Sequence, residues 1–262
     1  MSESIPVVIG REGAVGIVEL ARPEKFNCLS IAAHGLLETA FDAFEEPGSG
    51  VRAVLVRAQG KNFCTGADLD EVLSLRTDTD AVSRFIGPAH RALKRLESSA
   101  LPVVAACQGL ALAGGLELML ACDVVFAARD ARFGDQHAQF GLLPGFGGSQ
   151  RLPRIIGPRR AMDLFLSARW IDAETALQWG LVNYVVEPDR LAIAAQDYCA
   201  ALATRSGIGL ATMKRFVRQG MEGSLESGLA MEERLVTAAL LDDDVSEGLA
   251  AFQERRTPKF RS

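Results

Sequence analysis

Histidine is scarce in this 262-residue chain, and its cysteines follow no metal-binding or redox pattern. There are three histidines and five cysteines, and no two cysteines form a CxxC pair. Structural zinc sites and dithiol redox sites depend on such clusters, so the composition predicts neither. The odd number of cysteines at unrelated spacings also argues against a disulfide framework, and we expect reduced thiols in a cytoplasmic protein.

An excess of basic residues is missing as well, because 28 Lys and Arg face 33 Asp and Glu and the net charge is -5. Nucleic acids and anionic membranes require a positive surface, so neither is an expected partner. The start, MSESIPVVIG, lacks a basic stretch followed by a long apolar one, and we expect no secretory signal. The most apolar stretch, residues 101–128, contains Gln108, Glu117 and Asp123, which predicts buried strands and a helix instead of a membrane span.

What the chain does contain is 48% hydrophobic residues, arranged as alternating strand-like and helix-like segments. Two β-rich runs at residues 6–10 and 14–20 predict a hairpin. Apolar residues at helical spacing over 31–46 predict a helix capped by Ser30. Further strands are expected at residues 51–56, 102–107, 124–128 and 182–186.

Beyond Asp189 only helical patterns remain. A helical tail after a strand-and-helix core is expected to pack on another surface, either its own core or a neighbouring subunit. The sequence therefore predicts an α/β core over residues 1–198 and a helical, oligomer-forming region over residues 199–262.

Two loops that follow predicted strands carry glycines where a ligand could approach the backbone. In Gln108-Gly-Leu-Ala-Leu-Ala-Gly-Gly-Leu-Glu117, Gly114 and Gly115 open a helix directly after a strand. Glycine admits a ligand close to backbone N–H groups, and the positive end of the helix favours an oxygen there. The segment Lys61-Asn-Phe-Cys-Thr-Gly-Ala-Asp-Leu69 could supply a second N–H. Two such donors could hold the enolate of a thioester, whereas a turn chosen only for close packing would carry the same glycines.

Several motifs occur in one order along the chain. They are Arg22-Pro-Glu-Lys-Phe-Asn27, Phe63-Cys-Thr-Gly-Ala-Asp68, Gly109 through Glu117, Cys122-Asp123, Phe133-Gly134 and Gly141-Leu-Leu-Pro-Gly-Phe-Gly-Gly-Ser-Gln-Arg-Leu152. With these motifs the chain resembles the crotonase superfamily, which includes enoyl-CoA hydratases and isomerases, over essentially its whole length. The resemblance implies a crotonase-like spiral of strand-strand-helix units, with a helical C-terminal part that builds homotrimers and often hexamers.

The resemblance also implies which residues bind the substrate, an acyl-CoA thioester. The backbone N–H groups of Ala67 and Gly114 would form an oxyanion hole. Lys25 would lie near phosphate, and Phe252 and Arg255 would reach the coenzyme A of a neighbour, although their segment also fits an ordinary helix end. Coenzyme A is part of the substrate, and no other cofactor is expected because the thioester supplies the electron sink. The positions implied to bind coenzyme A are Arg22, Lys25, Cys28, Leu29, Thr65, Asp68, Leu69, Phe252 and Arg255.

Hydratases of this family use two carboxylates to add water across a double bond. Glu117 matches the first, and its apolar neighbours predict burial and a raised pKa. The position 20 residues later, where the second is expected, holds His137. Histidine can exchange a proton near neutral pH, so Glu117 and His137 could still hydrate an enoyl-CoA. Asp135 would share a side with His137 in an extended backbone and could orient the imidazole or act as the acid. Alternatively, His137 only fills space and bonds a backbone carbonyl.

The leading interpretation is therefore a hydro-lyase that adds water to a 2-enoyl-CoA, as in fatty acid metabolism, with Glu117 as acid and base. The turn at residues 145–147 has no acid, which disfavours the isomerisation, dehalogenation and ring closure of other members. Two alternatives stay open: hydrolysis of a β-dicarbonyl compound or an acyl-CoA thioester by water that His137 activates, and non-catalytic binding of acyl-CoA. We expect His34, His90 and Cys64 to be surface or packing residues. Candidates for an apolar acyl pocket are Leu73, Leu75, Phe85, Ile86, Leu142 and Phe146.

Overall fold

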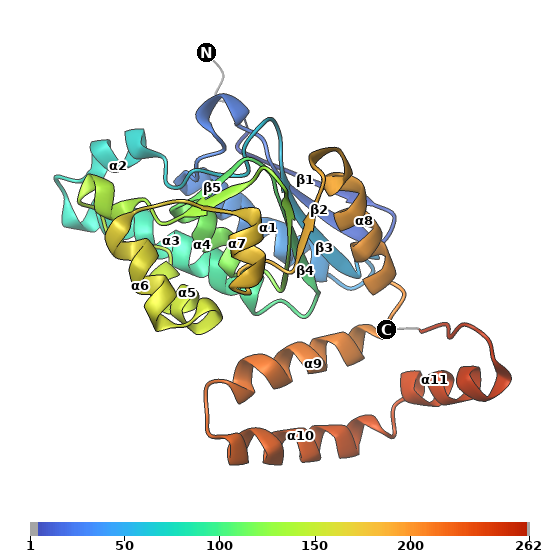
Figure 1. Ribbon diagram of the computed structural model, residues 1–262. Coiled ribbons are helices and arrows are strands. Elements are labelled where there is room, and N and C mark those ends of the chain that lie inside the picture. Colours follow the sequence, from blue (N-terminus) through green and yellow to red (C-terminus); the bar gives the residue numbers. More distant parts are fainter. Residues whose placement is uncertain (1–4, 261–262) are drawn as a thin grey trace.

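The structure, a computed structural model that describes residues 5–260, is a mixed α/β protein built on two sheets (Figure 1). The larger sheet contains β1 (Val7–Glu12), β2 (Val15–Leu20), β3 (Ala53–Ala58), β4 (Val103–Cys107), β6 (Val124–Ala128) and β9 (Tyr184–Val186). The smaller sheet contains β5 (Leu110–Leu112), β7 (Arg132–Gly134) and β8 (Ile171–Asp172). The ends of the two expected parts, residues 1–4 and 261–262, lie outside the described residues.

The larger sheet has the strand order β1-β2-β3-β4-β6-β9, in which only the β1–β2 hairpin is antiparallel. The smaller sheet has the order β5-β7-β8, with β5 and β7 parallel. Successive strands along the chain thus alternate between the sheets: β4 is followed by β5, and β6 by β7. The segment after β3 follows the same pattern, because Cys64 forms an isolated parallel bridge with Ala111 of β5, in the smaller sheet.

Helices separate these strand pairs and cover the sheets (Figure 1). In the first part of the chain they are α1 (Ile31–Glu45), α2 (Leu69–Leu75), α3 (Thr79–Glu97), α4 (Gly114–Leu120), α5 (Gly148–Ile156), α6 (Pro158–Ser167), α7 (Ala173–Gln178) and α8 (Leu191–Leu202). Three short 3-10 helices are η1 (Pro23–Lys25), η2 (His137–Phe140) and η3 (Pro188–Arg190). The repeated order of strand, strand and helix matches the expected spiral.

Most of the predicted elements are present, with shifts of a few residues at their ends. Ser30 caps α1 by accepting a hydrogen bond from the Ala33 N–H, and the hairpin turns at Gly13, which has a φ of 63°. The strand predicted at residues 51–56 runs from Ala53 to Ala58, and the strand predicted at 182–186 is confined to Tyr184–Val186. The two-residue strand β8 was not predicted, because it is too short to show an alternating pattern.

The core lies between the sheets and the helices that cover them. Its largest fully buried side chains include Phe41, Phe63 and Phe133, and the strand β4 is buried along its whole length. A parallel strand covered on both faces reads as a continuous apolar run, which explains why this strand was visible in the sequence.

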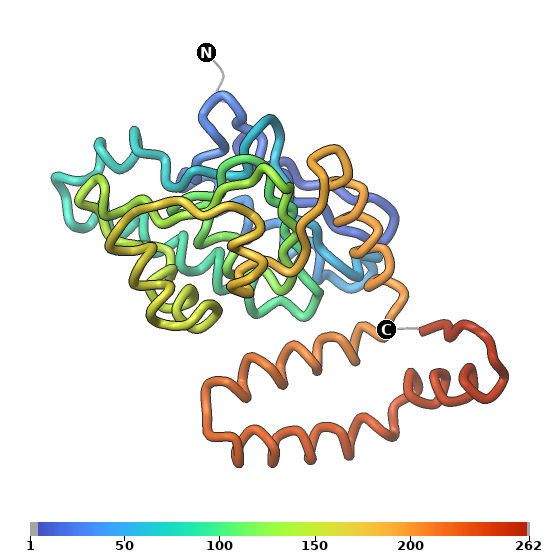
Figure 2. Tube along the Cα trace, viewed as in Figure 1, coloured from blue at the N-terminus to red at the C-terminus, as the bar shows by residue number. Residues whose placement is uncertain are grey.

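After α8 the chain leaves the core and forms the C-terminal arm, which we define as residues 207–254 (Figures 1 and 2). Its helices are α9 (Gly207–Gly220), α10 (Leu225–Ala239) and α11 (Asp243–Glu254). A division between residues 198 and 199 would cut α8, whose Ala195 and Cys199 are buried against the larger sheet. The expected boundary thus falls inside α8, and the division into a core and an oligomer-forming region stays a prediction.

Candidate active site

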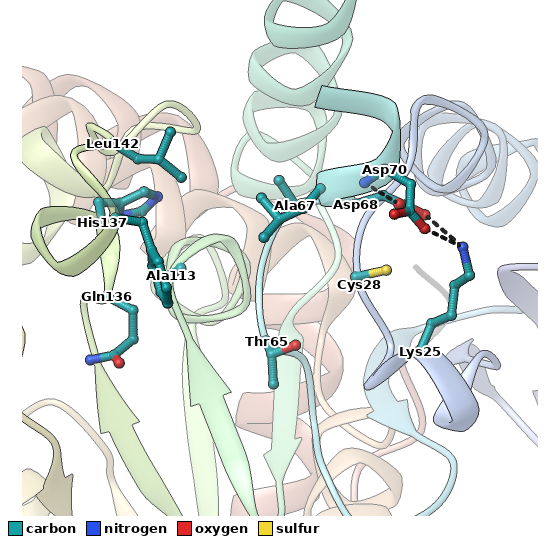
Figure 3. Close-up of a pocket in the computed structure, with 12 residues that line it drawn as sticks. Lys25, Cys28, Thr65, Ala67, Asp68, Asp70, Ala113, Gln136, His137 and Leu142 are labelled. Carbon is teal, nitrogen blue, oxygen red and sulfur yellow. Dashed lines mark hydrogen bonds and ion pairs between the residues drawn. The ribbon is translucent and has the colours of Figure 1, made fainter. Parts of the chain in front are cut away.

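Two adjoining pockets lie where the loops after β3, β5 and β7 meet. The outer pocket, of about 300 Å³, is lined by Lys25, Cys28, Thr65, Ala67, Asp68, Leu69, Asp70, Ala113, Gln136, His137, Phe140 and Leu142. The inner pocket, of about 120 Å³, is lined by Ala67, Leu69, Val72, Leu75, Val82, Phe85, Ile86, Gly114, Glu117, His137, Leu142, Leu143, Gly145 and Phe146. In Figure 3, His137 and Leu142 face Cys28 and Lys25 across the outer pocket, with Ala67 between them.

Ala67 and Gly114 line the inner pocket, and neither backbone N–H has a hydrogen-bond acceptor among residues 5–260. Leu29 bonds to Gly66 and Asp68, on either side of Ala67, so the Ala67 N–H points away from Leu29. Gly114 is the first residue of α4, where helix geometry provides no internal acceptor. Both donors are therefore available to a ligand.

The turns that carry these two donors touch each other. A Cβ atom on Gly114 would lie 3.2 Å from the Cα atom of Gly66, which leaves no room for a side chain between the turns. Ala113, just before Gly114, has a φ of 49°, a left-handed conformation that costs about 1–3 kcal/mol and is often found at functional sites. Its N–H donates to the carbonyl of Gly134, which ties this turn to β7.

Glu117 lies in the first turn of α4 and is only 1% exposed. One carboxylate oxygen, Oε1, accepts hydrogen bonds from the N–H groups of Phe146 (2.8 Å) and Gly148 (2.7 Å). Its other oxygen, Oε2, is buried and has no hydrogen-bond partner among the described residues. Burial raises the pKa of Glu117 above its ordinary value, and the two N–H donors oppose this effect only in part.

His137 faces the free oxygen of Glu117, with 3.9 Å between Nε2 and Oε2. The other ring nitrogen, Nδ1, is 2.9 Å from Oδ2 of the buried Asp135, whose Oδ1 accepts the backbone N–H of His137. Because a carboxylate only accepts, the hydrogen of a neutral ring belongs on Nδ1, and Nε2 is then an acceptor. Burial disfavours the charged imidazole, but Asp135 and Glu117 outweigh it and raise the pKa of His137.

Asp135 reaches His137 by a route different from the one expected. The backbone is not extended here, because β7 ends at Gly134 and η2 begins at His137. The carboxylate of Asp135 instead turns toward the residue two positions later, a local arrangement that Asp adopts readily.

Comparison with known proteins identifies the family. Residues 10–262 match the sequence model of the enoyl-CoA hydratase/isomerase family. The chain belongs to this family. A probable enoyl-CoA hydratase of Mycobacterium bovis is 38% identical over 255 residues, which cover 97% of each chain. A short-chain-enoyl-CoA hydratase of Clostridium acetobutylicum is 32% identical over 250 residues, which cover 95% of each chain.

Solved structures of hydratases share the fold. The enoyl-CoA hydratase from Bacillus anthracis matches with a TM-score of 0.92 at 33% identity, over 97% of this chain and 98% of that one. The enoyl-CoA hydratase from Polaromonas sp. JS666 matches with a TM-score of 0.94 at 29% identity, over 97% and 99%. The expected family, its enzyme class of hydro-lyases, and the crotonase-like fold are all confirmed by these comparisons.

Most of the positions that the family resemblance assigns to coenzyme A line the outer pocket. They are Lys25, Cys28, Thr65, Asp68 and Leu69. Lys25 is half-exposed and lies 3.1 Å from Asp70, a pocket residue that was not predicted. Burial raises the pKa of the Cys28 thiol to about 11, so this thiol is neutral and unreactive near pH 7.

The other four of these positions do not line either pocket. Arg22 is held beneath the pocket by Asp68 at 3.0 Å and by the carbonyl of Cys28, and Leu29 has no exposed surface. Phe252, 83% exposed, lies in the last turn of α11, and Arg255 caps the C-terminal end of that helix. Their expected contact is with a neighbouring subunit, which a single chain does not include.

Apolar side chains surround the inner pocket beyond Glu117 and His137. Of the expected acyl-pocket residues, only Leu73 is absent from it, because its side chain points outward from α2 and is 61% exposed. Behind the pocket lies His34, fully buried, with its ring edge-on to Phe146 at 5.0 Å and to Phe85 at 6.3 Å. His90 is exposed, and burial raises the pKa of Cys64 to about 12, in agreement with surface and packing roles.

The turn that holds Glu117 is the main feature that sequence analysis missed. The glycine cluster at residues 145–148 was noticed only for its lack of an acid, yet its backbone N–H groups bind the Glu117 carboxylate. A Cβ atom on Gly148 would lie 2.9 Å from Cγ of Glu117, which explains the glycine there. Among the described residues no three His, Cys, Asp or Glu side chains form a group that could hold a metal.

Proposed function

We propose that this protein hydrates a 2-enoyl-CoA to a 3-hydroxyacyl-CoA. The observation that carries the proposal is the unpartnered Oε2 of buried Glu117, which faces Nε2 of His137 inside a pocket bordered by two free N–H groups. An acid-base group, a water-holding group and an electrophilic site are thus available in one place.

The N–H groups of Ala67 and Gly114 are proposed to hold the thioester oxygen. Attack of water on the β carbon moves negative charge onto this oxygen, and two preorganised donors stabilise it by about 3 kcal/mol each. Because Gly114 opens α4, the positive end of the helix adds to this effect.

The nucleophile is proposed to be a water molecule between Glu117 and His137. A water oxygen can lie about 2.8 Å from both Oε2 and Nε2 when these atoms are 3.9 Å apart. One hydrogen bonds to Nε2, and the other passes to Oε2 as the oxygen attacks the β carbon. The enolate then collapses as protonated Glu117 returns that proton to the α carbon. Water is consumed, and Glu117 ends as it began.

In this mechanism Asp135 orients the imidazole and His137 replaces the second carboxylate of other hydratases. The proton on Nδ1 stays with the Asp135 hydrogen bond, which keeps Nε2 available as an acceptor. Both Glu117 and His137 must be deprotonated for water to donate to them. We therefore expect activity to fall on acidification, with a limb that belongs to the coupled pair.

The substrate is proposed to enter with coenzyme A in the outer pocket and an uncharged, apolar acyl group in the inner pocket. Lys25, which is half-exposed and lines the outer pocket, would bind a phosphate of coenzyme A. Beyond Glu117 and His137 the inner pocket offers only apolar side chains and glycines, which would leave a charged acyl group without partners. Such a substrate is consistent with a place in fatty acid metabolism.

The assembly is proposed to be a homotrimer or a hexamer in the cytoplasm. In α9 and α10 no described residue is buried. Several of their exposed residues are apolar, and four of these are more than half exposed: Met213, Val217, Leu225 and Leu229. Apolar residues along an otherwise uncovered helix pair favour a second copy as the covering surface. The five cysteines are all unpaired, as in a reducing compartment. No helix in the described part of the chain is long and apolar enough to span a membrane.

Crotonyl-CoA hydration, followed by loss of the absorbance of its conjugated thioester, tests the proposal. We expect turnover by the wild type, a fall of about 1,000-fold or more for Glu117→Gln, and a fall of about 100-fold for His137→Ala. Calorimetric binding of a saturated acyl-CoA should be retained by both variants. If the wild type binds this ligand but does not turn over any enoyl-CoA, the protein is an acyl-CoA binder and the proposal is wrong.

Hydrolysis is the second candidate, and the Asp135–His137 pair favours it. A histidine oriented by a carboxylate is a common general base for water. Incubation with a β-ketoacyl-CoA and with crotonyl-CoA, followed by detection of free thiol, separates the two reactions. If free thiol is released while the double bond is retained, the protein is a hydrolase and the proposal of hydration is wrong.

A further inference from the structure

A cluster of charged side chains connects the arm to the back of the active site. Arg218 of α9 lies 3.0 Å from Glu97 at the end of α3 and 2.7 Å from Asp123. Glu97 in turn accepts two hydrogen bonds from Arg151 of α5, at 2.8 and 3.2 Å. Lys214 of α9 completes the cluster at 2.6 Å from Asp123. These contacts lie outside both pockets.

Arg151 also contacts the turn that holds Glu117. Its Nη1 donates to the carbonyl oxygen of Phe146 at 3.0 Å, while the N–H of Phe146 donates to Oε1 of Glu117 at 2.8 Å. A Cβ atom on Gly147 would lie 2.2 Å from the same Nη1, so the guanidinium lies directly against the turn. The turn is therefore held from one side by Arg151 and from the other by Glu117.

The pair of Arg151 and Glu97 is well suited to hold the turn in one position. The two side chains are 17% and 29% exposed and meet through two parallel hydrogen bonds, a geometry that restricts both. Burial disfavours the Glu97 carboxylate, but Arg151 and Arg218 outweigh it and hold the pKa of Glu97 below its ordinary value. Glu97 is thus ionised at neutral pH, where its ion pairs with Arg151 and Arg218 are present.

We propose that Arg151 is a positioning residue for Glu117, and that Glu97 and Arg218 of the arm hold Arg151 in place. The inference rests on the proposed role of Glu117 as acid and base. By keeping the N–H groups of Phe146 and Gly148 on Oε1, Arg151 keeps Oε2 directed at His137. It also limits the rise in the Glu117 pKa, because those N–H groups favour the carboxylate. The arm thereby reaches the catalytic group without touching the substrate.

Kinetics of Arg151→Met and its control Arg154→Met test the proposal. Arg154 lies one turn further on α5 and is exposed, and within residues 5–260 its side chain hydrogen-bonds only to Gln150. For Arg151→Met we expect kcat to fall about 10- to 100-fold with KM within about twofold, because the catalytic group is misplaced while the pocket is intact. The midpoint of the acidic limb of its pH–rate profile should rise by about 1 pH unit, because the N–H groups of Phe146 and Gly148 would bind Oε1 less tightly. Arg154→Met should match the wild type.

A measurement that needs no turnover separates this proposal from the proposed reaction. In protein labelled with ¹³C in its glutamate carboxyls, the Glu117 resonance is the one that Glu117→Gln lacks. Its titration midpoint should rise in Arg151→Met and not in Arg154→Met. A raised midpoint in a protein that does not hydrate enoyl-CoA would uphold the positioning role and reject hydration. An unchanged midpoint in an active enzyme would overturn the positioning role alone.

Two milder variants keep the test decisive if Arg151→Met fails to fold. Arg151→Lys retains a charge for Glu97 but cannot also reach the Phe146 carbonyl, so a raised midpoint is still expected. Arg218→Met leaves Arg151 and Glu97 in place but removes the contact of the arm with Glu97. It should lower kcat about threefold and raise the midpoint slightly. Wild-type midpoints in both variants would overturn the proposal.

Discussion

The core and the C-terminal arm place their apolar residues in opposite ways. In the core, α3 buries six residues along one face, and β4 is buried along its whole length. In the arm, the described residues of α9 and α10 are all at least partly exposed, and Met221 and Leu241 are 80% and 86% exposed. The core thus folds around its own apolar surface, whereas the described residues of this chain leave many apolar side chains of the arm uncovered.

The same contrast holds for chemistry. Every residue that lines the two pockets belongs to the core, and the arm meets the core mainly through the charged contacts of Lys214 and Arg218. Polar contacts of this kind tolerate change better than close packing does. Substitutions of equal size should therefore have large effects in the core and small ones in the arm.

A large loss of activity is expected for Gly148→Ala, because an added Cβ would crowd the carboxylate of Glu117 in the core site. Its Cβ would lie 2.9 Å from Cγ and 3.0 Å from Oε1 of Glu117, so the carboxylate must move. A displacement of this kind should lower kcat by about 100-fold. Steady-state hydration assays measure it. The control is Gly35→Ala, at an exposed position of helix α1 where an added Cβ meets nothing. Equal rates for the two variants would mean that Gly148 does not position Glu117.

A smaller effect, on stability, is expected from His34 in the core. Burial lowers its pKa from 6.5 to about 4, so the unfolded chain binds a proton near pH 5 that the folded chain does not. Stability must then fall as the pH drops below about 6.5, by about 2 kcal/mol between pH 7 and pH 5. His34→Leu should abolish this part of the pH dependence in urea unfolding, whereas exposed His90→Leu should not. Identical pH dependence in the two variants would contradict the prediction.

The smallest effect on the chain itself is expected in the arm. Leu229→Gln combined with Leu240→Gln replaces an exposed residue of α10 and the exposed residue that caps its C-terminal end. The double substitution should change the unfolding free energy of a single chain by less than about 0.5 kcal/mol. The double variant should nevertheless self-associate more weakly than the wild type. Its oligomer should dissociate at protein concentrations at which the wild-type oligomer is still intact, which sedimentation velocity measures. Ile193→Gln, similarly exposed on α8, is the control. An unaltered mass at every concentration would exclude this face of α10 from the interface.

Sequence analysis located the elements and the acid-base residues because both leave local signals. Spaced apolar residues predicted α1, and its cap Ser30 accepts the hydrogen bond expected of it. Glu117 was identified through the family resemblance, and its apolar neighbours predicted the burial and the raised pKa that the structure shows. The burial of His34 was not predicted. Its helix has a buried apolar face and an exposed polar face, and a histidine is compatible with either.

The sequence by itself determined the α/β order of elements, the family, and the presence of one carboxylate and one histidine at the expected spacing. Only the tertiary structure decided that Oε1 of Glu117 is bound by the N–H groups of Phe146 and Gly148 while Oε2 is free, and that Arg151 reaches the same turn. The reason is physical: every residue except proline carries a backbone N–H, so no residue type marks which ones converge. Convergence depends on how segments that are distant along the chain pack together.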